Sequence, residues 1–331
     1  MAAKPFRMPT LRRRKFAALL GAAFAAGGLA RCGRHGSSTS ASEPAPPSFA
    51  QATGAIRALI ARDAADPAIL RAALPRLYEH GTPVQHAVVL FHGFTNCPQQ
   101  FDELARAFHA RGCNVYVPRI PHHGLKDRLT RDLANLSVGE LQRNAEDSFQ
   151  LTRGLGTTVS ALGLSLGGSM ALWLAQSKPI DLAVPIAPFL MPYPIPPFIG
   201  EPGMLYLHTI PNMYWWWDFH VKQNTRPIYA YPGYPTHALA ELIFFGNAIA
   251  SQAQKTKPRG RRCVLVTNPH DNAVDNDVAR RLLKAWNRHG AGYTELVLTG
   301  LGPPRHDIID PTTYPQGRTL VYPKLESLVF G

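Results

Sequence analysis

Gly163-Leu164-Ser165-Leu166-Gly167 is the stretch of sequence that decides the fold. It lies between residues 158–162, an apolar run predicted to be a strand, and residues 168–172, a run of small and apolar residues predicted to begin a helix. A serine held between glycines at such a junction is typical of a sharp, strained turn, because a Cβ at either glycine would clash with the neighbouring strand or helix. We therefore predict a nucleophile elbow that exposes the hydroxyl of Ser165.

An elbow serine needs a base and an acid that orients the base, and in this architecture they follow in the chain order serine, acid, histidine. Asp271 follows residues 262–267, a predicted buried strand. His306 follows residues 293–298, the predicted last strand. The predicted catalytic residues are therefore Ser165, Asp271 and His306.

Two other acidic residues compete with Asp271 for the orienting role. Asp275 and Asp277 stand where a helix over residues 278–289 begins, a position that favours acidic residues as caps for structural reasons alone. Asp271 is therefore the preferred acid, and Asp307, next to the histidine, is interpreted as a loop residue.

An oxyanion hole is the remaining part of such a site. Residues 86–91, a predicted strand, end in the run His92-Gly93-Phe94-Thr95. The backbone N–H groups of Phe94 and Leu166 are predicted to meet the negative oxygen of a tetrahedral intermediate. His92 is interpreted as a structural residue.

The sequence resembles the α/β-hydrolase superfamily, and within it the bacterial carboxylesterase and monoacylglycerol-lipase-like group. The motifs that carry the resemblance are His92-Gly93-Phe94-Thr95 with Pro98, Pro118-Arg119 before His123-Gly124, Gly163-Leu164-Ser165-Leu166-Gly167-Gly168, Asp271-x-x-Val274, and His306. The resemblance covers residues 78–331 and implies the α/β-hydrolase fold. It also implies that the triad of the family falls on Ser165, Asp271 and His306.

Apolar runs that alternate with helical patterns predict, independently, an α/β fold with a mostly parallel sheet and helices on both faces. The predicted strands lie near residues 86–92, 114–119, 158–164, 182–187, 262–268 and 293–299. At 331 residues, 45% of them hydrophobic, the chain is long enough to bury one large core. We predict a hydrolase domain over residues 86–331, preceded by a linker and an N-terminal helical arm over residues 43–85.

Residues 188–237 break the regular alternation, with several prolines and an aromatic run at 213–217. They follow the strand after the predicted elbow helix, where this superfamily carries an inserted cap or lid, whose apolar side chains would cover an acyl group. The predicted substrate contacts are Thr95, Trp215, Trp216 and Trp217. The alternative is that any one tryptophan only packs on the domain, because adjacent side chains cannot all face one way.

Residues 1–42 carry eight positive charges and no acidic residue. Their apolar run, 16–30, is short for crossing a bilayer and typical of a signal peptide. Arg13-Arg14-Lys15-Phe16 resembles a twin-arginine export signal. We therefore predict export across the inner membrane, to the periplasm or out of the cell. The alternatives are membrane attachment through this segment or a lipid on Cys32, and a disordered basic tail.

The formal charge of +13 suggests a nucleic-acid partner, but it falls to +5 once the eight positive charges of residues 1–42 are subtracted. The basic tract at 255–262 is interpreted as a solvated loop, because no aromatic stacking motif accompanies it. No Cys-x-x-Cys pair, His-Glu-x-x-His motif or phosphate-binding loop occurs, and the adjacent His122 and His123 rarely converge on one ion. We predict no metal, no cofactor and no nucleic acid.

Three cysteines, Cys97, Cys113 and Cys263, are predicted to stay free thiols even after export, which usually favours disulfides. Cys97 and Cys113 flank a helix predicted over residues 99–111, which sets their Cα atoms about 20 Å apart. A disulfide needs roughly 4.4 to 6.8 Å. The strand order of the superfamily implies that Cys113 and Cys263 are not neighbours either.

The motifs together predict a serine hydrolase that cleaves carboxylic esters with an apolar acyl group through an acyl-enzyme intermediate. A peptidase or an acyltransferase on the same triad is the first alternative, distinguished by turnover of amides or by an alcohol that outcompetes water. A binding protein that kept the fold and lost the chemistry is the second, and labelling by a fluorophosphonate distinguishes it.

Overall fold

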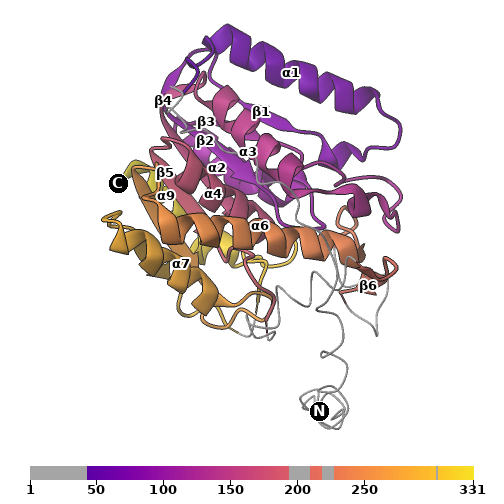
Figure 1. The fold of residues 1–331 in the computed structure, drawn as a ribbon. Helices are drawn as coiled ribbons and strands as arrows, with labels where there is room; N and C mark the ends of the chain where they lie inside the picture. Colours follow the sequence, from indigo (N-terminus) through magenta and orange to yellow (C-terminus); the bar gives the residue numbers. More distant parts are fainter. Residues whose placement is uncertain (1–42, 194–208, 218–226, 303–304) are drawn as a thin grey trace, which may run out of the picture. The chain divides into compact units, whose positions relative to one another are not determined.

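A seven-stranded sheet forms the centre of the computed structural model, which describes residues 43–193, 209–217, 227–302 and 305–331 (Figure 1). The strand order is β1-β3-β2-β4-β5-β8-β9. The strands are β1 (Arg76–Tyr78), β2 (Val84–Phe91), β3 (Asn114–Val117), β4 (Gly156–Leu164), β5 (Leu182–Ile186), β8 (Arg262–Thr267) and β9 (Thr294–Val297). Every pairing is parallel except that of β1 with β3. The predicted fold class is confirmed.

β1 is the strand of the main sheet that the sequence pattern does not predict. It has three residues, none of them fully buried, and pairs Leu77 with Tyr116 at the edge of the sheet. The six predicted strands all form. Five of them carry several buried apolar residues, whereas β9 is an edge strand whose buried neighbours, Tyr293 and Leu298, flank it. β2 and β4 pair along the whole of β2, from Val84 opposite Gly156 to Phe91 opposite Gly163. This long pairing sets the ends of the two strands side by side.

Helices cover both faces of the sheet (Figure 1). The longer ones are α1 (Phe49–Ala65), α2 (Asp102–Ala110), α3 (Val138–Thr152), α4 (Leu166–Ser177), α6 (Thr236–Lys255), α7 (Asn276–Arg288) and α9 (Tyr322–Phe330). Short helical segments are η1 (Arg71–Ala73), η2 (Pro98–Phe101), η3 (Asp132–Asn135) and α8 (Gly317–Leu320). α3, α4 and α6 contact one another, α7 contacts α6, and α2 contacts α9. The helices predicted at 99–111 and 278–289 correspond to η2 with α2 and to α7.

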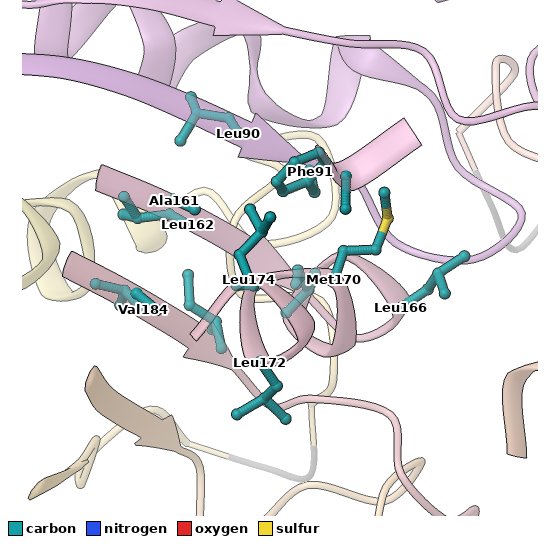
Figure 2. Packing of buried hydrophobic residues seen from close by; sticks show 14 of the residues in the cluster. Leu90, Phe91, Ala161, Leu162, Leu166, Met170, Leu172, Leu174 and Val184 are labelled. Carbon is teal, nitrogen blue, oxygen red and sulfur yellow. The ribbon is translucent and has the colours of Figure 1, made fainter. Parts of the chain in front are cut away.

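α4 is the helix that begins at the elbow, and it is buried along almost its whole length. Figure 2 shows α4 beside the central strands, with Leu174 and Met170 on the side near Phe91 and Leu162. A helix that is apolar on all sides is stable only when neighbours cover all of it. The elbow therefore leads into a helix that the rest of the fold covers.

The cap region is described only in part. β6 (Tyr214–Trp216) and β7 (Gly233–Pro235) form an antiparallel pair apart from the main sheet. Residues 194–208 and 218–226 of the predicted lid lie outside the described residues, as do residues 1–42 with Cys32. The export signal and the lipid attachment therefore stay predictions. In the part of the chain that the structure covers, no helix has the length and apolar character needed to cross a membrane.

Cys97, Cys113 and Cys263 are buried free thiols, as predicted. β3 and β8, which lie next to Cys113 and Cys263, are separated in the sheet by β2, β4 and β5. Burial raises the pKa of Cys97 and of Cys113 to about 12 and raises that of Cys263 as well. The three thiols are thus kept protonated and unreactive.

Candidate active site

Ser165 lies at the tip of a strained turn between β4 and α4. Its φ of 58° and ψ of −116° are rare for a residue with a side chain. The turn is held by its own backbone: the Ser165 N–H donates to Ile186 O at 2.9 Å, and the Ser165 carbonyl accepts from the N–H groups of Ser169 and Phe189, both at 3.0 Å. These three hydrogen bonds hold Ser165 in the strained conformation that the elbow motif predicts.

The glycines on either side of Ser165 are required by close backbone contacts. A Cβ at Gly163 would lie 2.2 Å from Gly167 O, and a Cβ at Gly167 would lie 2.0 Å from Phe91 O. Atoms cannot approach this closely, and in both cases the obstacle is backbone that cannot turn aside. The sequence argument for glycine at these two positions therefore agrees with the geometry.

His306 and Asp271 form a hydrogen-bonded pair beside the elbow. His306 Nδ1 lies 2.8 Å from Asp271 Oδ2. The Asp271 side chain is fully buried, and its other oxygen accepts from the backbone N–H groups of Ala273 (2.8 Å) and Val274 (3.1 Å). Three hydrogen bonds fix the carboxylate, so the ring of His306 is held in one orientation.

The two competing acids have a different task. Asp275 is the N-cap of α7, where its side chain accepts from the N–H groups of Asp277 and Val278. Asp277 is exposed and forms an ion pair with Arg280 at 3.0 Å. Of the three carboxylates weighed in the sequence, Asp271 is the one bonded to His306.

The two N–H groups predicted to form an oxyanion hole lie at the ends of β2 and β4. Within the described residues the Phe94 N–H donates to no protein acceptor. Leu166 is the first residue of α4, whose N–H has no partner inside the helix. The neighbouring Gly93 N–H, by contrast, donates to Gln100 Oε1 at 2.7 Å. The arrangement leaves two backbone donors available at the elbow.

His92 supports this loop from below. Its Nδ1 donates to Gly93 O at 3.0 Å, and its Nε2 accepts from the Ile120 N–H at 3.1 Å. These two bonds require a neutral ring, and complete burial lowers its pKa to about 3. The structural role predicted for His92 agrees with these contacts.

His122 and His123 point to different partners. His122 contacts Asp132 at 2.9 Å and Glu140 at 3.2 Å, and all three line a groove of about 580 Å³ between α1 and α3 whose lining does not include Ser165. His123 is buried, contacts Pro121 O at 2.8 Å, and has a pKa held well below its usual value by burial. Among the described residues, no group of three or more His, Cys, Asp or Glu side chains could hold a metal ion.

A cavity of about 330 Å³ opens at the elbow. Its apolar wall consists of Phe94, Leu164, Phe189, Pro192, Trp217, Tyr234, Leu239 and Ala273. Its polar lining consists of Asn96, Gln100, Ser165, Tyr193, Asn272, His306 and Asp307. The cavity thus has both apolar and polar lining residues, and Ser165 and His306 are both among them.

Of the four predicted substrate contacts, only Trp217 lines this cavity. Trp215 packs against the core, and Trp216 contacts the ring of Tyr214. Thr95 is buried, and its Oγ1 accepts from Trp217 Nε1 at 2.9 Å. Thr95 orients Trp217 through this hydrogen bond, and Trp215 and Trp216 do not line the cavity that the described residues form. The substrate contacts of Thr95, Trp215 and Trp216 therefore stay predictions.

Sequence reasoning missed Gln100 and undervalued Asp307. Gln100 Nε2 donates to Asp307 Oδ2 at 2.7 Å, and both residues line the cavity. Asp307 is therefore more than the loop residue predicted. No local pattern could reveal the pair, because the two residues lie at opposite ends of the domain sequence.

Residues 88–315 match the α/β hydrolase family. The chain belongs to this family. It is 32% identical over 111 residues to a thermostable monoacylglycerol lipase of Bacillus sp. (strain H-257), an alignment that covers 34% of this chain and 42% of the relative. It is 31% identical over 101 residues to a carboxylesterase of Bacillus subtilis (strain 168), covering 30% of this chain and 40% of the relative. The alignments thus span about two fifths of each relative.

Solved structures support the fold. The chain resembles a structure from work on the metagenome-derived lipolytic enzymes LipS and LipT, with a TM-score of 0.61 and 19% identity. That likeness covers 79% of this chain and 99% of the other.

Proposed function

We propose that the protein is a serine hydrolase of carboxylic esters, with Ser165 as nucleophile, His306 as base and Asp271 as the acid that orients the base. The observation that carries the proposal is the Asp271–His306 hydrogen bond of 2.8 Å in the wall of the cavity into which the elbow places Ser165. A serine on a strained elbow is inert alone, and a neutral histidine with one tautomer fixed is the partner that activates it.

The reaction follows from these positions. His306 Nε2 takes the proton of Ser165 as Ser165 Oγ forms a bond to the carbonyl carbon of the ester. The N–H groups of Phe94 and Leu166 stabilise the negative oxygen that results. Collapse of this intermediate breaks the ester bond, and His306 gives its proton to the departing alcohol. Water then repeats the sequence on the acyl-enzyme, so that no cofactor is needed.

The cavity and the relatives support an ester with an apolar acyl group. Phe94, Trp217, Tyr234 and Leu239 give the cavity an apolar wall that suits an acyl chain. The polar lining residues, among them Asn96 and Asn272, suit an alcohol moiety with hydroxyl groups. A monoacylglycerol lipase and a carboxylesterase are among the relatives, and their names describe esters of this kind.

Ser165→Ala tests the proposal. We expect kcat on p-nitrophenyl esters and monoacylglycerols to fall by about 10³-fold or more, because triad members act as one unit. Ser177→Ala is the matched control, since Ser177 ends the same helix and its hydroxyl donates to Trp173 O. A fluorophosphonate should label the wild type and the control but not Ser165→Ala.

The alternatives give different results in the same assays. Amide turnover at rates that match esters would indicate a peptidase, and an alcohol that outcompetes water would indicate an acyltransferase. A wild-type protein that neither hydrolyses the esters nor reacts with the fluorophosphonate would refute the proposal in favour of a binding protein.

A further inference from the structure

The side chain of Gln100 joins two loops at the cavity. Gln100 lies in η2, is 2% exposed, and accepts the Gly93 N–H on Oε1 at 2.7 Å. Its Nε2 donates to Asp307 Oδ2, also at 2.7 Å. One buried amide thus connects the residue before Phe94 with the residue after His306.

The chemistry of its partners fixes the orientation of this amide. A backbone N–H can only donate, so the Gln100 atom that faces Gly93 must be the oxygen. The nitrogen must then face Asp307, whose carboxylate can only accept. Asp307 is itself oriented, because its Oδ1 accepts from the N–H groups of Ile309 (3.2 Å) and Asp310 (3.0 Å). Every hydrogen bond in this chain of contacts has one allowed direction.

The two loops that Gln100 joins supply opposite halves of the proposed site. The loop after β2 supplies the Phe94 N–H, and the loop after β9 supplies His306. The second loop is held from its other side by Asn268, whose Nδ2 donates to Arg305 O at 2.8 Å. Among these contacts, Gln100 is the one that joins the loop carrying His306 to the loop carrying Phe94.

We propose that Gln100 and Asp307 are positioning residues of the ester hydrolysis assigned above, on which this inference rests. They hold the Phe94 N–H and the His306 ring at a fixed separation around Ser165. The N–H donor must meet the carbonyl oxygen while the base meets the hydroxyl of Ser165 and the departing oxygen, and a displacement of about 1 Å costs on the order of 100-fold in rate.

A reversal of the hydrogen bond tests the proposal. Gln100→Glu keeps the acceptor for Gly93 but sets a second carboxylate against Asp307. Asp307→Asn keeps the acceptor for Ile309 and Asp310 but turns an NH₂ toward the NH₂ of Gln100. The double variant Gln100→Glu/Asp307→Asn restores one donor and one acceptor, with the direction of the bond reversed and the net charge unchanged.

We expect each single variant to lower kcat on a short-chain p-nitrophenyl ester by about 10- to 100-fold with little change in KM, since the apolar wall is untouched. The double variant should recover to within a few-fold of the wild type. Rates are taken per active site titrated with a fluorophosphonate, so that loss of folded protein does not count as loss of kcat.

Two further variants complete the design. Gln99→Glu is the matched control: it is the same substitution one residue away, where Arg76 lies 2.7 Å from Gln99 Oε1, and it should keep the wild-type kcat. Gln100→Met removes both hydrogen bonds without adding a charge, and should lower kcat like Gln100→Glu even if the charged variant does not fold.

Three outcomes would overturn the inference. Single variants that turn over at the wild-type rate per titrated site would show that the bridge does not position the reacting groups. If kcat of the double variant is no higher than the value expected from combining the two single losses, the hydrogen bond between the two side chains is not the cause of those losses. A wild type without ester hydrolysis or labelling would refute the proposed function, and the positioning role with it.

Discussion

The elbow, residues 163–168, and the histidine loop, residues 305–310, hold their functional side chains by opposite means. Backbone packed against backbone fixes the elbow, where a Cβ at Gly167 would lie 2.0 Å from a carbonyl oxygen. Side-chain hydrogen bonds fix the histidine loop, through Asn268 and Gln100. Backbone packing produces a motif of five consecutive residues that can be recognised in the sequence. The side-chain hydrogen bonds, by contrast, join residues that are distant in the chain. Substitutions in the elbow should therefore mainly prevent folding, whereas substitutions in the contacts of the histidine loop should mainly lower kcat.

Gly167→Ala tests the backbone constraint at the elbow, and we expect it to have the largest effect. The added methyl group meets the carbonyl of Phe91, which β2 holds in place, so we expect the free energy of unfolding to fall by more than about 4 kcal/mol or the protein not to fold. Gly54→Ala is the control: Gly54 lies inside α1 with nothing within 4 Å of the added Cβ. It should gain about 1 kcal/mol, because alanine favours a helix. Urea unfolding measures both, and a Gly167→Ala protein as stable as the wild type would contradict the steric account.

The next largest effect is the pH dependence that the buried His92 gives to the free energy of unfolding. Since burial lowers the pKa of His92 to about 3 from 6.5, the unfolded chain binds a proton at that residue between these values and the folded protein does not. Its contribution to stability is full above pH 6.5 and is lost as the pH falls toward 3. Between pH 7 and pH 5 the loss should amount to about 2 kcal/mol.

His92→Gln isolates this effect, because it removes one titrating group and keeps one donor and one acceptor. The pH dependence of its unfolding free energy should be flatter than that of the wild type by the same amount over the same range. Equal slopes for the two proteins would show that His92 is not the neutral buried group described.

Asn268→Ala tests the histidine loop, where the expected effect on stability is smaller than that of Gly167→Ala. Asn268 is 1% exposed, and the substitution leaves the Arg305 carbonyl without its donor and the His270 N–H without its acceptor. We expect a loss of about 1 to 3 kcal/mol and a roughly 10-fold lower kcat, since His306 follows Arg305 directly. Asn135→Ala, which removes an exposed hydrogen bond to Asp132, should change neither by much. An Asn268→Ala variant with the stability and the kcat of the wild type would show that the loop does not need this contact.

The same contrast explains what the sequence could and could not predict. The elbow, the six parallel strands and the pairing of Asp271 rather than Asp275 with His306 follow from short patterns: periodicity, flanking glycines and a capping position. β1 was missed because three partly buried residues carry no apolar run. These patterns arise from interactions between residues close in the chain, so they can be recognised without knowing which distant residues lie nearby.

The lining of the cavity depended on side-chain direction and on distant contacts. Trp217 lines it whereas Trp215 and Trp216 do not. The alternation of a strand separates Trp216 from Trp217 but places Trp215 on the same face as Trp217, so no sequence pattern singles out Trp217. Gln100 and Asp307 carry no local signal, since each is meaningful only when the other lies beside it. Predictions from sequence were therefore best where the fold is locked by backbone and weakest where it is held by side chains.

The pairing of β2 with β4 also governs how quickly the molecule can fold. Phe91 pairs with Gly163, about 70 residues later in the chain, and the two strands are parallel, so a long loop must close before the first bond between them forms. Helices α2 and α3 can form early from local contacts, but the elbow cannot exist until this closure is complete. During refolding from urea, helical circular dichroism should return well before the reactivity of Ser165 does, which makes that hydroxyl a late reporter of the folding pathway.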